Sequence, residues 1–183
     1  MNVSFGNLIR ATGEINESIF PVRHLSRDYA IDTGGPGKWR GCPGTLYIKE
    51  LCAPSQIYTY VVGMKYPMPG IAGGKPGAPN QLKLRCGGPH EHIVETTAFY
   101  VDHLPGERYE YRYGGGGGWG DPLEREPQKV LDDVLDEYVS VEGARRDYGV
   151  VLTGSLEDLT LAIDSAATEA LREELKATAD ARR

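Results

Sequence analysis

A run of five glycines, Gly114–Gly118, restricts more than any other feature what this chain can fold into. Glycine has no side chain to bury and loses more backbone freedom on ordering than any other residue. Such a run serves either as a flexible linker or where the backbone approaches another group too closely for a Cβ atom. Linkers usually mix in serine and other polar residues, whereas tyrosines and Trp119 flank this run and Gly120-Asp121-Pro122 closes it. These anchors favour an ordered loop over a linker.

Two further stretches, 33–41 and 63–80, are also rich in glycine and proline. In the first, tight turns surround Trp39, with Lys38 and Arg40 on either side of it. An anion or partner contact is one interpretation; a turn fixed by a buried Trp39 is favoured, because no helix N-terminus follows the glycines directly. In 63–80, four prolines exclude a helix or a central strand. The stretch is expected to be extended and polyproline-like, and to form a second candidate surface.

Short strands are predicted elsewhere in the first two thirds of the chain. Alternating polar and apolar or β-branched residues mark them at 29–32, 45–51, 56–62, 81–86, 91–95, 98–102 and 108–113. The strands at 45–51 and 56–62 are expected to form an antiparallel pair through a turn at 53–55. Short strands at this spacing are typical of a sandwich or barrel.

Helical patterns follow Pro127. One apolar face is formed by Val130, Leu131, Val134, Leu135, Tyr138 and Val139, and the opposite polar face by Asp132, Asp133, Asp136 and Glu137. A second short helix is expected at 141–148, ended by Gly149, and a last one from Asp164 or Ser165 to about residue 179. The charged residues of that last helix, Arg172 among them, are expected to be a solvated face.

These patterns together predict an α+β chain that is mainly β, sandwich- or barrel-like, with C-terminal helices. The expected division is an N-terminal arm over 1–27, a β domain with glycine- and proline-rich loops over 28–125, and a helical segment over 126–183. The hydrophobic fraction of 40%, with 24 glycines and 12 prolines, is lean for a self-sufficient domain. We therefore expect the chain to complete its core against a partner.

Charge and cysteine content exclude several classes of function. The net charge of −6, with scattered basic residues, argues against a nucleic-acid or anionic-membrane surface. No apolar run approaches the length of a membrane span. Three cysteines without a repeated spacing are typical of reduced thiols in a cytoplasmic protein.

The segment Cys86–His92 is the one place where residue types that bind metals gather. Cys86, His90 and His92, with Cys42 or Cys52, could supply the four ligands of a zinc site. Their spacing matches no standard pairing, so we predict no metal and no cofactor on this chain and keep these residues as weak candidates. No nucleophile, phosphate-loop or dinucleotide motif is present, and the catalytic residues stay unknown.

Several long motifs resemble the C-terminal part of the hydantoinase B/oxoprolinase family. They are the glycine run through Arg125, Val130-x3-Val134, 138–142, 144–152, Phe20-Pro-Val-Arg23, Asp32–Gly41 and Gly70–Pro79. The resemblance covers nearly the whole chain but only the last quarter of the family's length. Cys42 stands where the family has a second glycine, and Glu137 where it often has glycine.

The resemblance implies a subunit of a large ATP-dependent complex that activates a carbonyl by phosphorylation. It implies two partners, a hydantoinase A-like ATP-binding subunit and a long hydantoinase B-like chain lacking this C-terminal part. ATP and a divalent metal, Mg or Mn, are expected on those partners, so this chain is expected to be inactive alone. We favour ketone carboxylation of the acetone or acetophenone type; alternatives are hydrolysis of a cyclic amide, as in hydantoinases and 5-oxoprolinase, and a non-catalytic scaffold.

The candidate interface or active-site loop comprises Gly114, Gly115, Gly116, Gly117, Gly118, Trp119 and Asp121. Asp121 is expected mainly to cap the helix that follows it. If the run is packed with positive φ angles, Gly116→Ala and Gly118→Ala should each cost on the order of 1 kcal/mol or more.

Overall fold

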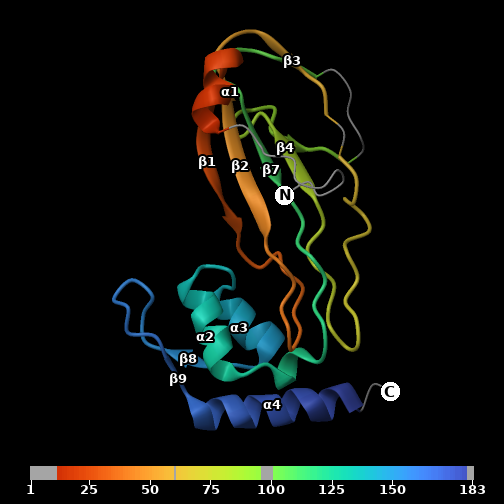
Figure 1. Cartoon of the computed structure of the whole chain (residues 1–183), viewed down its shortest axis with the longest axis vertical. Coiled ribbons are helices and arrows are strands. Elements are labelled where there is room, and N and C mark those ends of the chain that lie inside the picture. Colours follow the sequence, from red (N-terminus) through yellow and green to blue (C-terminus); the bar gives the residue numbers. More distant parts are fainter. Residues whose placement is uncertain (1–11, 60, 96–100, 181–183) are drawn as a thin grey trace. The chain divides into compact units, whose positions relative to one another are not determined.

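The computed structural model describes residues 12–59, 61–95 and 101–180 (Figure 1). By its contacts the chain forms two compact units, each assembled from separate stretches of sequence. The sheet unit comprises residues up to 30, 44–66 and 79–114, and the helical unit comprises 31–43, 67–78 and 115–183. The contiguous domain limits expected from the sequence stay a prediction.

The sheet unit contains a five-stranded antiparallel sheet in the order β1-β2-β7-β4-β5. Its strands are β1 (Val22–Ala30), β2 (Gly44–Leu51), β4 (Gln81–Leu84), β5 (His92–Ile93) and β7 (Arg108–Arg112). A separate pair is formed by β3 (Ser55–Ile57) and β6 (Val101–His103). The hydrophobic cluster of this unit gathers Val61, Leu82, Leu84 and Val94, with Tyr109 and Tyr111 packed against it.

One expectation for the sheet unit is wrong, and one helix was not expected. The stretches 45–51 and 56–62 do not pair, because β1 and β7 already occupy both edges of β2, and β3 pairs with β6 instead. The segment expected to be an arm contains a helix, α1 (Gly13–Ile19), directly before β1. Glu14 lies in its first turn, where a negative charge favours a helix, although the residues show no strong periodicity.

The helical unit contains η2 (Pro122–Glu124), α2 (Pro127–Leu135), α3 (Val141–Tyr148) and α4 (Ser165–Asp180), with a small hairpin of β8 (Leu152–Thr153) and β9 (Ala162–Ile163). Its hydrophobic cluster is formed by Val130, Val134, Val139, Ala144, Tyr148 and Val150. As expected, Gly149 ends α3, with a left-handed φ of 61°. Asp164 caps α4 by accepting a hydrogen bond from the Ala167 N–H. The α+β fold class is confirmed.

Two charged residues of the helical unit lie differently from the expectation. Asp133 was placed on the solvated face of α2, but it is only 7% exposed, because two arginines neutralise it. Arg172 was placed on a solvated face of α4. Its guanidinium instead donates to the backbone oxygens of Tyr148 at 3.0 Å and Arg125 at 2.7 Å. Periodicity sorts residues by polarity alone, so a charge that is buried with a partner is assigned to the wrong face.

Within the described ranges, no helix combines the length and the apolar character that a bilayer span requires.

Candidate functional site

Three segments of the helical unit, 33–42, 67–78 and 115–120, lie side by side and are called here the glycine bundle (Figure 1). Each segment is hydrogen-bonded to both of the others. The N–H of Gly116 donates to the Cys42 oxygen at 2.9 Å, and the N–H of Gly118 to the Lys75 oxygen at 3.0 Å. The N–H of Lys75 in turn donates to the Pro36 oxygen at 2.7 Å. The run is therefore an ordered, packed segment, as predicted. The stretch 67–78 is not one extended segment, because it turns back on itself: the Gly74 N–H donates to the Ile71 oxygen at 3.0 Å and the Gly77 N–H to the Met68 oxygen at 3.0 Å.

Close backbone approach explains why glycine is needed in this run. A Cβ atom on Gly115 would lie 2.0 Å from the Thr33 oxygen, on Gly117 1.9 Å from the Pro69 oxygen, and on Gly118 2.2 Å from the Pro36 oxygen. Real Cβ atoms do not come this close to other atoms. None of Gly114–Gly118 has a positive φ, so the expected left-handed strain within the run is wrong; Gly120, just after it, has φ 74°.

Gly116 differs from its neighbours in the run. The atom nearest to a Cβ built there is the Cys42 nitrogen at 3.4 Å, an ordinary van der Waals contact. Alanine therefore fits at Gly116, which corrects the expectation of a steric cost at that position. The run consequently contains its own control position for mutagenesis.

The two tryptophans of the chain lie on this bundle. Trp39 and Trp119 face each other in an antiparallel bridge. Trp39 is 56% exposed, so the interpretation of a turn fixed by a buried tryptophan is wrong. Asp121 acts as expected: its carboxylate accepts the N–H of Leu123 at 2.8 Å and caps η2.

Both basic residues beside Trp39 are paired within the helical unit. Lys38 contacts Glu124 at 3.1 Å. Arg40 contacts Asp133 at 3.1 Å, and Arg125 contacts the other oxygen of the same carboxylate at 2.8 Å. Arg125 also donates to the backbone oxygen of Lys38. This ion cluster ties the first segment of the glycine bundle to α2.

The candidate metal residues do not form a cluster. Within residues 12–59, 61–95 and 101–180, no three His, Cys, Asp or Glu side chains are placed to hold a metal ion. The Cys86 Sγ lies 3.5 Å from the Lys83 oxygen, and the His92 Nδ1 lies 2.9 Å from the His90 oxygen. Burial raises the pKa of the Cys86 thiol, and the charge of Glu110 adds to this. A raised pKa disfavours the thiolate that metal ligation requires.

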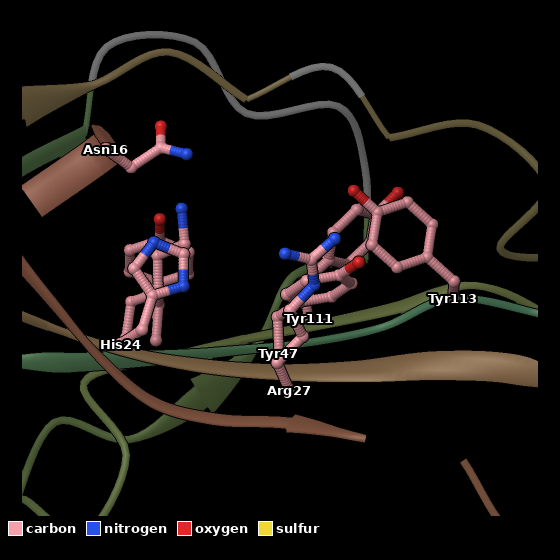
Figure 2. A pocket seen from close by; sticks show the side chains of 8 residues that line it. Asn16, His24, Arg27, Tyr47, Tyr111 and Tyr113 are labelled. Atoms are coloured by element: carbon pink, nitrogen blue, oxygen red, sulfur yellow. The ribbon is translucent and has the colours of Figure 1, made fainter. Parts of the chain in front are cut away.

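A pocket of about 300 Å³ lies on one face of the sheet unit (Figure 2). Its lining residues are Asn16, His24, Arg27, Tyr47, Lys49, Tyr109, Tyr111 and Tyr113. Figure 2 shows His24, Arg27 and the labelled tyrosines projecting from the same side of the sheet, with Asn16 of α1 above them. The Arg27 guanidinium lies 5.5 Å from the centre of the Tyr47 ring. Both ring nitrogens of His24 are buried and lack a hydrogen-bond partner.

The chemistry of this pocket suits a small ligand that has a planar body and an acceptor group. Tyrosine rings provide flat apolar walls, and His24 offers an unused hydrogen-bonding group beside two cationic side chains. Sequence reasoning missed this pocket, because its residues come from α1, β1, β2, β7 and Tyr113, the residue after β7. The local signals were the alternations that place Tyr47 and Lys49 on one face of one predicted strand, and Tyr109, Tyr111 and Tyr113 on one face of another.

Acidification is expected to destabilise the chain through His24. Burial, followed by the charge of Lys49, lowers the pKa of His24 in the folded chain. In the unfolded chain the imidazole of His24 becomes protonated near pH 6.5, whereas in the folded chain it stays neutral to a lower pH. The free energy of unfolding therefore falls as the pH drops below about 6.5. The loss is complete once the pH lies below the lowered folded pKa. Urea unfolding at pH 7.5 and 5.5 should show a larger loss for the wild type than for His24→Gln; equal losses would contradict this.

Comparison with known proteins assigns the chain to a family. Residues 1–122 match the family model described as hydantoinase B/oxoprolinase. The chain belongs to this family. The resemblance seen in the sequence motifs is thereby confirmed, and the whole glycine bundle lies within the matched residues.

Two relatives within the hydantoinase B/oxoprolinase family are named for cyclic amides. The beta subunit of a caprolactamase from Pseudomonas jessenii is 34% identical over 92% of this chain and 29% of its own length. The B-type subunit of a putative D-/L-hydantoinase from Pseudomonas sp. (strain NS671) is 33% identical over 77% of this chain and 24% of its own length. The chain thus spans less than a third of the length of these relatives.

Solved structures share the fold. The ATP-dependent caprolactamase from Pseudomonas jessenii superposes with a TM-score of 0.79 over 92% of this chain and 29% of that chain. A nucleotide-free acetone carboxylase superposes with a TM-score of 0.77 at 25% identity, over 94% of this chain and 27% of that chain. The hydantoinase B/oxoprolinase relatives therefore include enzymes of both the hydrolytic and the carboxylating kind.

Proposed function

We propose that this chain is a subunit of an ATP-dependent complex that hydrolyses a cyclic amide such as a lactam or a hydantoin. The observation that carries the proposal is the similarity along almost the whole chain to an ATP-dependent caprolactamase, at 34% identity and a TM-score of 0.79. The family resemblance had favoured ketone carboxylation, because construction from several subunits is commoner in the carboxylase branch of the family. The higher identity to the caprolactamase and hydantoinase relatives reverses that preference, and ketone carboxylation stays the second candidate because the acetone carboxylase shares the fold at 25% identity.

The proposed role of this chain is structural. The glycine bundle packs backbone against backbone, and no cluster that could hold a metal ion is found among the described residues, so we propose that the chain supports a site completed by other chains. The proposed partners are a hydantoinase A-like ATP-binding subunit and a long hydantoinase B-like chain. ATP and Mg or Mn are proposed to bind on those partners, in the cytoplasm.

An assay of the intact complex tests the proposed reaction. The affinity-tagged chain is purified with its companions and incubated with ATP and Mg²⁺ and, separately, caprolactam, hydantoin, 5-oxoproline, or acetone with bicarbonate. We expect ring-opened product and ADP with at least one cyclic amide, and no carboxylated ketone. If carboxylated ketone forms and no ring is opened, the result would favour ketone carboxylation, the second candidate function. ATP-independent or absent turnover with every substrate would favour a non-catalytic scaffold.

A further inference from the structure

Three large apolar side chains form a continuous row on the glycine bundle. Trp119 is bridged to Trp39 on one side and to Ile71 on the other. Residues that face each other in a bridge place their side chains on the same face. Trp39 is 56% exposed, Trp119 50% and Ile71 65%. We call Trp39, Trp119 and Ile71 the tryptophan row.

Charged side chains border this row. The Lys129 ammonium lies 5.2 Å from the centre of the Trp39 ring, and it contacts Glu126 at 3.8 Å. Lys38, the residue before Trp39 in the sequence, forms an exposed ion pair with Glu124 at 3.1 Å. An apolar, aromatic centre with a polar rim is the usual composition of a protein–protein interface.

We propose that the tryptophan row is the surface on which a long hydantoinase B-type chain docks. This inference rests on the proposed function, since it assumes a complex of the same kind. More than two thirds of the length of the caprolactamase relative has no counterpart in this chain. In such a complex the remaining architecture has to contact this chain. All three row residues lie in the stretch that matches the family model.

The concentration of tryptophan on this row singles it out among the exposed apolar residues. The chain has two tryptophans, and both are in the row. Tryptophan is the residue type most enriched at positions that dominate binding energy in interfaces. Leu159 is more exposed, at 80%, but it lies in the turn between β8 and β9 with a left-handed φ of 54°. Leu159 therefore provides a matched control in the same unit.

The test measures recovery of the long chain with tagged variants of this chain. The tagged wild type, Trp119→Gln, Trp39→Gln, Ile71→Gln and Leu159→Gln are expressed with the companion chains, and the recovered hydantoinase B-type chain is quantified by mass spectrometry. We expect about thirtyfold weaker association for Trp119→Gln, the loss typical of a dominant interface tryptophan. Leu159→Gln should associate like the wild type, and Trp119→Phe should restore most of the association.

The outcomes separate this inference from the proposed function. Undiminished association of the Trp119→Gln and Trp39→Gln variants would overturn the docking surface while leaving the complex intact. Absence of any hydantoinase B-type chain with the tagged wild type would overturn both. Circular dichroism of the recovered variants monitors folding. Because the row side chains are at least half exposed, we expect unchanged spectra. Loss of association with an altered spectrum in Trp119→Gln and Trp39→Gln alike would overturn the inference as well.

Discussion

Replacing Asp133 by alanine is expected to lower the free energy of unfolding by about 3–5 kcal/mol. Its carboxylate is 7% exposed and accepts contacts from Arg40 at 3.1 Å and Arg125 at 2.8 Å. Removing it leaves two guanidinium groups side by side in a poorly solvated place with no compensating charge. Nε atoms of both arginines are already buried without a hydrogen-bond partner, so they have little capacity for rearrangement. Urea unfolding followed by far-ultraviolet circular dichroism measures the loss.

Asp132→Ala is the matched control for this prediction. Asp132 is the preceding residue of the same helix, but it is exposed and contacts Gln128. Removing a solvated carboxylate of this kind is expected to change the free energy of unfolding by no more than about 0.5 kcal/mol. The loss in free energy of unfolding for Asp133→Asn should lie between the losses for Asp133→Ala and Asp132→Ala, because asparagine preserves the shape of the side chain but not its charge. Similar values for Asp133→Ala and Asp132→Ala would show that water already neutralises the arginines.

Gly117→Ala and Gly118→Ala are each expected to destabilise the chain by about 3 kcal/mol, the upper part of the range for overpacked sites. The new methyl groups would lie 1.9 Å from the Pro69 oxygen and 2.2 Å from the Pro36 oxygen. Both obstacles are backbone atoms of neighbouring segments, and the Pro36 oxygen also accepts a hydrogen bond from the Lys75 N–H, so relieving the clash requires the segments to move apart. Thermal and urea unfolding give the effect on stability.

The Gly116→Ala variant tests whether steric clashes or chain entropy determine how Gly→Ala substitutions in this run affect stability. Its Cβ would meet nothing closer than 3.4 Å. Alanine also restricts the unfolded chain, so Gly116→Ala should be neutral or stabilising by up to about 1 kcal/mol. Comparable losses at all three positions would show that the bundle responds to glycine content and not to local close approach.

The local elements and the family were predictable from the order of the amino acids alone. Alternating residues indicated strands such as Gly44–Leu51, and the apolar stripe of 130–139 indicated the helix and the buried cluster around Val134. Capping followed directly from local chemistry, as at Asp121 and Gly149. These features depend on residues close in sequence, and the glycine run was recognisable because no other residue tolerates such close backbone approach.

Which groups meet in space was settled by the packing of distant segments. The pairing of β3 with β6, the burial of Asp133 between two arginines, and the exposure of Trp39 all depend on residues far apart in the chain. The same holds within the glycine run. A Cβ atom added at Gly117 would clash with a carbonyl oxygen, whereas one added at Gly116 would make an ordinary van der Waals contact. Hydrophobic periodicity reports the polarity of each position, but the steric and electrostatic cost at that position is set by its neighbours in space. For this reason five identical residues in a row are not equivalent.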